Sequence, residues 1–292
     1  MPDTFFTASP HWTWFIIPYF FVGGIAGGAY FLAALLQWFG RPEDRPVIRT
    51  GYSLAFWGAI ISGALLTLDL GKPFRFWHML FQSENFPNLM FKSWSPISFG
   101  AWAILLFGAC AAVSWYGKGG ALLAKLVAGL GGLLGFFVAG YTGVLLSVTN
   151  RPIWADSPWL GALFLASGAS TGAAALALFA SGSGASERSI RWLTSFDSQA
   201  LVVELILLIV FVASLGAVAK VWLGFWGLVL LVGVVGAGIL WPLRLHFKPA
   251  AASAGFHNPA LMVLLGGFLL RTVVLLASNS IAAHHVASGG MP

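Results

Sequence analysis

The sequence carries very little charge and almost no cysteine. Asp, Glu, Lys and Arg make up 8% of its 292 residues, whereas roughly a quarter of a soluble globular chain is charged. Hydrophobic residues make up 59%, and the mean hydropathy is +0.87. This composition excludes a soluble globular protein and indicates a polytopic membrane protein. The single cysteine, Cys110, excludes a disulfide framework and an iron–sulfur cluster held by cysteines of this chain.

Other familiar sites are missing as well. The sequence has no GxGxxG after a strand and no P-loop, which excludes the common nucleotide sites. The net charge of +6 arises from few residues, so it sets membrane orientation and does not indicate a nucleic-acid partner. All six histidines lie at the ends of apolar runs or in the tails. Because a membrane b-type haem needs axial ligands at depth, we expect no haem in this chain.

Eight apolar runs are each long enough to cross about 30 Å of hydrocarbon. They lie at roughly 14–39, 51–69, 96–116, 122–147, 158–180, 199–219, 222–243 and 259–281. Because the runs are continuous rather than alternating, we expect helices and not barrel strands. The sequence therefore predicts an all-α integral membrane protein, a single polytopic domain of eight transmembrane helices over residues 1–292 in a lipid bilayer.

The two halves of the chain, about 1–150 and 151–292, share a glycine pattern. Residues 24–29 of the first run resemble residues 168–173 of the fifth. Four helices in each half would make parallel repeats. The alternative is a chance match, because small residues are common in membrane helices.

Lysine and arginine are distributed unequally between the two membrane faces. The connectors after odd-numbered runs carry nine of them, and the opposite side carries five. The positive-inside rule then predicts that both termini lie outside.

Polar residues gather at the predicted outer face. Residues 69–78 combine Asp69, Lys72, Arg75 and His78. The same face receives His11, Tyr141, Arg151, Asn279 and Ser280. One acid, imidazoles, cations and a phenol suit a quinone headgroup, which needs hydrogen-bond donors and proton acceptors. The alternative is interfacial anchoring. This alternative suits Lys72 and Arg75 taken singly, whereas Asp69 favours function because a carboxylate gains nothing from snorkelling.

Glu204 and Arg271 are the ionisable residues deepest in their runs. A charge at the centre of a spanning helix costs about 2.5–3.5 kcal/mol, so both should be buried and partnered. They are candidates for a proton path or a headgroup contact. The alternative is a fixed polar clasp between helices. Asp197 lies near the start of its run and is interpreted as interfacial.

The chain resembles the NrfD/PsrC family, the membrane subunits of polysulfide-reductase-like and related oxidoreductases. The matching stretches follow the family order from the first run to the last. They are residues 19–24, 68–77, 95–102, 141–147, 151–154 and 266–271.

The resemblance implies two four-helix bundles without haem, in a bacterial or archaeal cytoplasmic membrane. The outer side, where the charge count places both termini, is then the periplasm. It implies menaquinone or ubiquinone bound near the face that docks a ferredoxin-like, multi-cluster iron–sulfur subunit. That subunit would exchange electrons with a catalytic molybdopterin or multihaem cytochrome subunit. The family's headgroup contacts, matched to this sequence, become His11 or its neighbours, Asp69 and Tyr141.

These observations favour a quinone-reactive membrane subunit of a multisubunit oxidoreductase, with proton translocation left open. One alternative is a proton-coupled transporter or channel, which Glu204 and Arg271 keep open. However, transporters often have broken helices and polar sites at mid-depth, whereas these runs are uninterrupted. The other alternative is a passive anchor without quinone chemistry.

Overall fold

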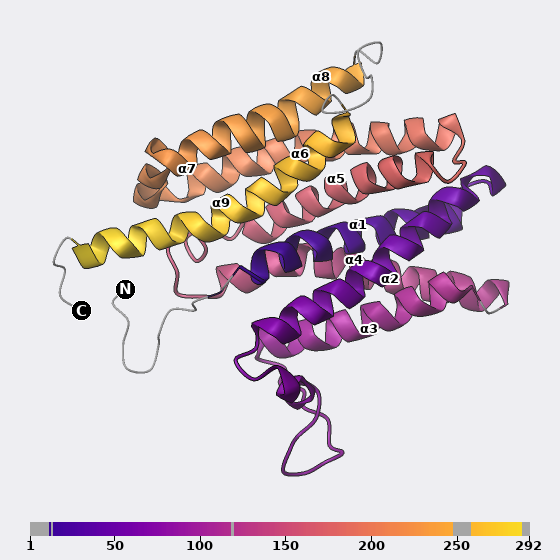
Figure 1. Ribbon diagram of the computed structural model, residues 1–292, viewed down its shortest axis with the longest axis horizontal. Helices are drawn as coiled ribbons and strands as arrows, with labels where there is room; N and C mark the ends of the chain where they lie inside the picture. The colour runs from indigo at the N-terminus through magenta and orange to yellow at the C-terminus, as the bar shows by residue number, and fades with distance from the viewer. Residues whose placement is uncertain (1–11, 13, 118–119, 248–257, 288–292) are drawn as a thin grey trace.

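The computed structural model describes residues 12, 14–117, 120–247 and 258–287. Within these residues, eight helical stretches are long and apolar enough to cross a membrane, which confirms the predicted fold class (Figure 1). They are α1 (Ile16–Phe39), α2 (Arg45–Asp69), α3 (Pro96–Tyr116), α4 (Ala121–Ser147), α5 (Leu160–Ser181), α6 (Glu187–Ser214), the stretch Phe225–His246, and α9 (Pro259–Ala287).

The seventh spanning stretch is a composite helix. It consists of α7 (Phe225–Leu228), η4 (Val229–Leu240) and α8 (Trp241–Phe247), and η4 has π-helical hydrogen bonding. The described connector segments include three short 3₁₀ helices: η1 (Pro42–Asp44), η2 (Pro73–Met79) and η3 (Gly216–Leu223). In the described parts of the chain, β pairing is confined to one bridge in the α2–α3 connector.

The helices form two adjoining groups with α1 and α5 at the centre (Figure 1). α1 packs against α2 and α4 within the first group and against α5 of the second. α5 packs in turn against α6 and α9. α2 and α3 lie on one side of this centre, and the composite seventh helix lies on the other. Residues near the start of α1 therefore face both groups.

The two central helices cross through glycines. Gly24 and Gly28 of α1 face Gly168 and Gly172 of α5. A Cβ atom added to Gly172 would lie 2.7 Å from the backbone nitrogen of Ala29. Real Cβ atoms do not approach other atoms so closely, so only glycine fits at this position. Small residues let helix backbones approach this closely in membranes. The two glycine patterns that resemble each other in the sequence are thus in direct contact.

Two helices begin earlier than the hydropathy predicted. α2 begins at Arg45 and not at residue 51, and α6 begins at Glu187 and not at residue 199. Hydropathy marks the segment that lipid can cover, whereas a helix continues through polar turns when its ends are capped. Ser186 caps α6 by accepting a hydrogen bond of 3.1 Å from the backbone nitrogen of Ser189. α6 also ends at Ser214, before residue 219, because Gly216 adopts a φ of 55°.

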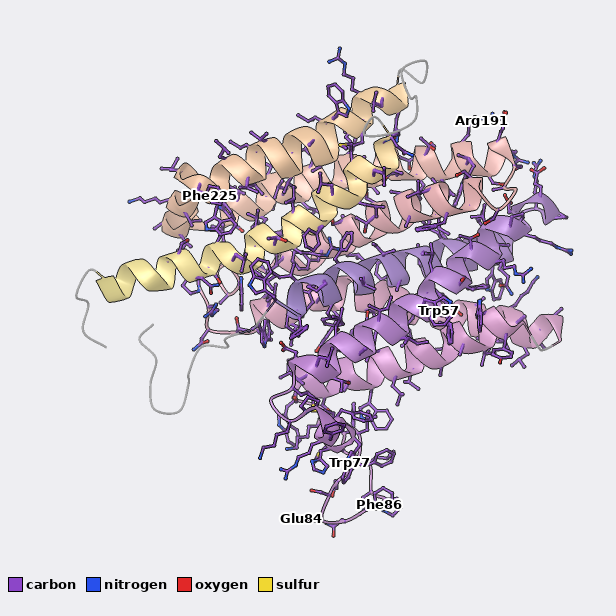
Figure 2. The ribbon with its side chains drawn as sticks, in the orientation of Figure 1. Trp57, Trp77, Glu84, Phe86, Arg191 and Phe225 are labelled. Carbon is purple, nitrogen blue, oxygen red and sulfur yellow. The ribbon has the colours of Figure 1, made fainter. Side chains whose placement is uncertain are left out.

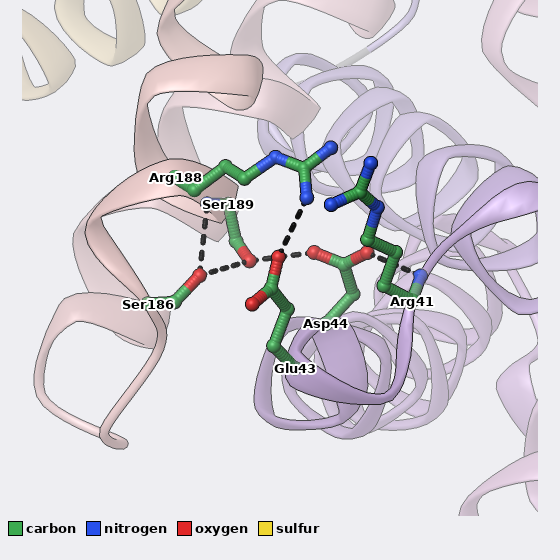
Figure 3. A network of polar contacts seen from close by, with 6 residues as sticks. All are labelled: Arg41, Glu43, Asp44, Ser186, Arg188 and Ser189. Atoms are coloured by element: carbon green, nitrogen blue, oxygen red, sulfur yellow. Dashed lines mark hydrogen bonds and ion pairs between the residues drawn. The ribbon is translucent and has the colours of Figure 1, made fainter.

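A polar network fastens η1 to the start of α6 (Figure 3). The Ser189 hydroxyl donates to the buried Asp44 carboxylate, which also accepts from the backbone nitrogen of Arg41 at 2.7 Å. Arg188 and Glu43 form an exposed ion pair at 2.8 Å, of a kind that contributes little to stability. The buried Asp44 contact therefore joins the two helix groups more firmly than the ion pair does.

Candidate functional site

A cavity of about 660 Å³ lies where α2 ends and α3 begins. We call it the Asp69 cavity, and we call this end of the helix bundle the Asp69 end. Its walls come from the start of α1, the end of α2, η2, the start of α3 and the end of α4. It therefore belongs to the first helix group, with α1 as its boundary to the second.

Polar side chains from three different helices meet in this cavity. Asp69 is the last residue of α2 and is half-buried. Tyr141 of α4 is buried, and its hydroxyl donates to the backbone carbonyl of Pro96, the first residue of α3. Tyr19 of α1 is also buried, and no described residue hydrogen-bonds its hydroxyl. The structure thus brings the predicted pair Asp69 and Tyr141 together and adds Tyr19, which the sequence reasoning did not select.

The rest of the cavity is an apolar groove between α2 and α3. It reaches Ala59, ten residues before Asp69, which corresponds to about 15 Å along a helix. Gly63 and Gly108 keep the groove open, because neither carries a side chain. Ile60 of α2 lines the groove and is 47% exposed on the outer surface of the helices. The groove therefore continues to the surface that lipid would cover.

Local capping fixes the α3 wall of the cavity. Ser95 accepts from the backbone nitrogen of Ser98, and Pro96 occupies the first turn, where its missing N–H costs nothing. The indole of Trp102 donates to the carbonyl of Met90 at 2.9 Å, which ties the connector back onto α3. The backbone carbonyl that Tyr141 contacts is thereby held in place.

The α2–α3 connector stands away from the helices and carries Trp77, Glu84 and Phe86 (Figure 2). Its η2 helix turns Phe76 and Met79 toward the cavity. The three charged or titratable residues predicted here do not line it. Lys72 and Arg75 are exposed, and the His78 ring packs edge-on against Trp77 with 3.9 Å between ring centroids.

Arg151 is buried beside the cavity and does not line it. Its guanidinium donates to the side chains of Ser278 and Asn279 of α9 and lies 5.2 Å over the Trp154 ring. Trp154 stacks on Trp12, which lines the cavity, at a centroid distance of 5.4 Å. Two aromatic rings thus separate Arg151 from the site. The predicted contact His11 lies outside the described residues.

Glu204 and Arg271 are fully buried in the second helix group, as predicted. Arg271 donates to the Phe20 carbonyl at 3.0 Å, to the Ser167 hydroxyl at 3.1 Å and to the Gly267 carbonyl at 2.7 Å. Ser167 in turn interacts with Glu204. Neither ionisable residue lines the Asp69 cavity.

The interpretation of Asp197 as interfacial is wrong. Its side chain is buried and accepts a hydrogen bond of 2.7 Å from Ser170 of α5. α6 extends back to Glu187, so Asp197 lies well inside the helix rather than at its start. α5 and α8 cover it there, and His246 of α8 lies 3.8 Å from its carboxylate.

Comparison with known proteins gives one consistent result. The family model described as "Polysulphide reductase, NrfD" matches residues 3–283. The chain is 27% identical to the NrfD homolog of Haemophilus influenzae, over 95% of this chain and 97% of that one. It is 28% identical to the C subunit of polysulfide reductase from Wolinella succinogenes (92% and 94%) and 29% identical to NrfD of Escherichia coli (90% and 92%). The family model thus matches nearly the whole chain, and the structure has the eight spanning helices that the matching motifs follow in order. This protein therefore belongs to the NrfD family of multi-pass membrane proteins.

Proposed function

We propose that this chain is the quinone-reactive membrane subunit of a multisubunit oxidoreductase. It exchanges electrons between the membrane quinone pool and an iron–sulfur partner subunit. The observation that carries the proposal is the shape of the Asp69 cavity, whose polar corner continues into an apolar groove at the lipid-facing surface. One relative is named as the C subunit of a polysulfide reductase, which is in keeping with a membrane subunit of a reductase.

The cavity has suitable dimensions for a quinone. Its volume of about 660 Å³ falls in the range of roughly 300–1,000 Å³ that is typical of small-molecule sites. The polar corner suits the headgroup, and the groove along Ile60 and Gly63 suits an isoprenoid tail that continues into lipid. Menaquinone and ubiquinone share both features, so the cavity accommodates either.

The side chains at the polar corner have complementary roles. The Tyr19 hydroxyl donates a hydrogen bond to the headgroup, and the Asp69 carboxylate accepts one. The Tyr141 hydroxyl already donates its one proton to the Pro96 carbonyl, so its oxygen acts toward the headgroup only as an acceptor. Asp69 therefore takes the proton from a quinol hydroxyl, and Tyr19 orients the oxygen at the other side of the ring. Oxidation of one quinol releases two electrons and two protons.

The electrons leave to a partner protein. An iron–sulfur cluster docked at the Asp69 end is the acceptor that we propose, and it passes electrons to a catalytic molybdopterin or multihaem subunit. The exposed α2–α3 connector, with Lys72 and Arg75 at its surface, lies next to the cavity and is available for that contact.

The test uses the complex purified with its soluble subunits and their clusters in place. Reduction of the clusters by menaquinol and ubiquinol analogues is followed by absorbance. Asp69→Asn should abolish this reduction while leaving the complex assembled. The matched control is Glu84→Gln, which makes the same chemical change in the connector that follows α2, away from the cavity. This control should behave like the wild type.

Two results would contradict the proposal. A cluster-loaded wild-type complex that neither quinol reduces would indicate a passive anchor. Equal activity of Asp69→Asn and Glu84→Gln would remove Asp69 from the site.

A further inference from the structure

The end of the helix bundle opposite the Asp69 end carries two arginines that take no part in the site described above. Arg45 is the first residue of α2, and Arg49 follows it by one helical turn, so both lie on the same face of the helix. Both side chains are exposed. A cation in the first turn of a helix meets the positive end of the helix dipole, so Arg45 does not stabilise α2. Its position therefore needs another explanation.

Neither arginine has an acidic partner. None of the ion pairs in the described parts of the chain includes Arg45 or Arg49. The two acids just before α2 are engaged elsewhere, because Glu43 pairs with Arg188 and the Asp44 carboxylate is bonded to the start of α6 (Figure 3). Two neighbouring positive charges are thus left, among the described residues, without a counter-charge.

Arg45 and Arg49 border two pockets at the surface. The larger one, of about 710 Å³, lies between α2 and the end of α5, and we call it the Arg45 pocket. The other, of about 380 Å³, lies between the end of α1, the start of α2, the end of α3 and the start of α4. No described aspartate or glutamate lines either pocket. Both guanidiniums therefore face a positively charged space that attracts an anion.

The Arg45 pocket combines this charge with hydroxyls and with apolar surface. Thr50 and Ser53 line it on α2, directly after the two arginines. Leu54 of α2 and Phe179 of α5 then form an apolar wall, and Phe179 is 54% exposed. Along α2 the order is therefore charge, hydroxyl and hydrocarbon. A phospholipid has the same order in its phosphate, its glycerol esters and its acyl chains.

Aromatic residues indicate the level of the membrane surface at this pocket. Trp115, near the end of α3, lines the Arg45 pocket and is 38% exposed, and its neighbour Tyr116 is 66% exposed. Tryptophan and tyrosine are enriched where lipid headgroups lie. The pocket therefore lies at headgroup depth, and the apolar run of α2, which begins at residue 51, continues from it into the hydrocarbon.

The Arg45 pocket also lies at the junction of the two helix groups. α2 belongs to the first group, whereas Phe179 is part of α5 and Ser183 follows the end of α5. The two helices contact each other. A ligand in the pocket therefore touches both groups, and a ligand that binds only the folded protein stabilises it.

We propose that the Arg45 pocket binds one anionic phospholipid from the leaflet at this end. The two guanidiniums donate paired hydrogen bonds to the phosphate oxygens, a geometry that suits arginine. Thr50 and Ser53 face the glycerol esters, and an acyl chain lies along Leu54 and Phe179. A zwitterionic headgroup is disfavoured, because its ammonium group would find no carboxylate in the pocket.

The lipid has a structural role that does not depend on the quinone function. It fastens α2 to α5 at the end of the helices opposite the quinone site. The positive-inside count predicts that this end faces the cytoplasm, so the lipid belongs to the inner leaflet.

The test uses the complete chain, with any subunits that co-purify, stripped of lipid in a neutral detergent. Dioleoyl phosphatidylglycerol, dioleoyl phosphatidylcholine or inorganic phosphate is added at the same phosphorus concentration. Native mass spectrometry measures the fraction of protein that retains one lipid, and thermal unfolding measures the melting temperature. We expect phosphatidylglycerol to be retained in preference to phosphatidylcholine and to raise the melting temperature. Inorganic phosphate should leave the melting temperature unchanged.

Variants assign the effect to the pocket. Arg45→Gln combined with Arg49→Gln should weaken phosphatidylglycerol binding roughly tenfold or more, the effect of losing a charge-assisted hydrogen bond, and abolish the rise in melting temperature. The matched control is Arg191→Gln combined with Arg244→Gln, which removes two exposed arginines at the same end that line neither pocket. This control should bind phosphatidylglycerol like the wild type. Should the first double variant fail to fold, Arg49→Gln alone provides the same comparison.

Three results would overturn the proposal. Equal retention of phosphatidylglycerol and phosphatidylcholine by the wild type would show that the arginines do not select a lipid. Equal weakening in the two double variants would indicate a general effect of surface charge. An equal rise in melting temperature with inorganic phosphate would assign the pocket to a free anion and not to a lipid.

Discussion

The guanidinium of Arg271 lies directly against the backbone of Gly24, although 247 positions separate the two residues in the sequence. A Cβ atom at Gly24 would come within 2.6 Å of Nη2. Arg271 is fully buried and bonded on its other nitrogens, so it has little freedom to move away. The packing of α1 on α9 depends on this missing side chain.

The first prediction follows from that contact. Gly24→Ala should destabilise the protein by about 1–3 kcal/mol, the usual effect of overpacking a close-packed interior. Thermal unfolding in detergent measures the change. Gly129→Ala is the matched control, because its added methyl group would meet nothing closer than 3.7 Å. Equal melting temperatures of the two variants would contradict the close contact.

The second prediction separates the two tyrosines of the quinone site. The Tyr141 hydroxyl is bonded to the Pro96 carbonyl, whereas no described residue hydrogen-bonds that of Tyr19. Tyr19→Phe should lower kcat/KM for quinol roughly two- to tenfold, the effect of one hydrogen bond, and leave the melting temperature unchanged. Tyr141→Phe should lower both kcat/KM and the melting temperature. If Tyr19→Phe affects stability alone, its hydroxyl does not contact the headgroup.

The third prediction concerns the apolar groove. No atom lies within 4 Å of a Cβ atom added to Gly63, so Gly63→Leu fills the groove without a clash. Leucine is the better helix former by up to about 1 kcal/mol, so stability should not fall. KM should rise for a long-tailed quinol and change less for a tail-less analogue. Ala64→Leu, on the exposed neighbouring position, is the control. The same KM change for both substrates would place the tail elsewhere.

The fourth prediction addresses orientation. Glu84 lies in the α2–α3 connector, and Arg191 lies at the opposite end of the helices, near the start of α6 (Figure 2). In a Cys110→Ala background, Glu84→Cys should react with a membrane-impermeant maleimide in spheroplasts, whose outer envelope has been removed and whose cytoplasmic membrane is intact. Arg191→Cys should react only after permeabilisation. The reverse pattern would place the termini, and the Asp69 cavity, on the cytoplasmic side.

The sequence was sufficient to predict the eight spans and the meeting of Asp69 with Tyr141. A long apolar run is stable in lipid as a helix, because a helix satisfies its own backbone hydrogen bonds. Consecutive spans cross the membrane in opposite directions, so the end of the second span, with Asp69, and the end of the fourth, with Tyr141, lie at the same face. Tyr19 was missed because a spanning helix is apolar on every side, so hydropathy does not tell which face meets a cavity. The prediction for Asp197 was wrong because the apolar run begins later than the helix that contains it. Capping by Ser186 extends α6 well beyond that run.

The α2–α3 connector shows a second limit of prediction from the sequence. Lys72, Arg75 and His78 are close to Asp69 in sequence, and that proximity suggested a common site. The 3₁₀ turn of η2 directs Phe76 and Met79 toward the cavity, while Lys72 and Arg75 are exposed to solvent. Nearness along the chain predicts the neighbourhood of a residue but not the direction of its side chain.

The glycine crossing of α1 and α5 also limits how the protein moves. Where backbone meets backbone, as at Gly28 and Gly172, no side chain is present that could change rotamer and open a gap. The two helix groups therefore share a rigid pivot at their centre. Any motion that accompanies turnover must be a rocking about that pivot, which moves the far ends of the helices more than the middle.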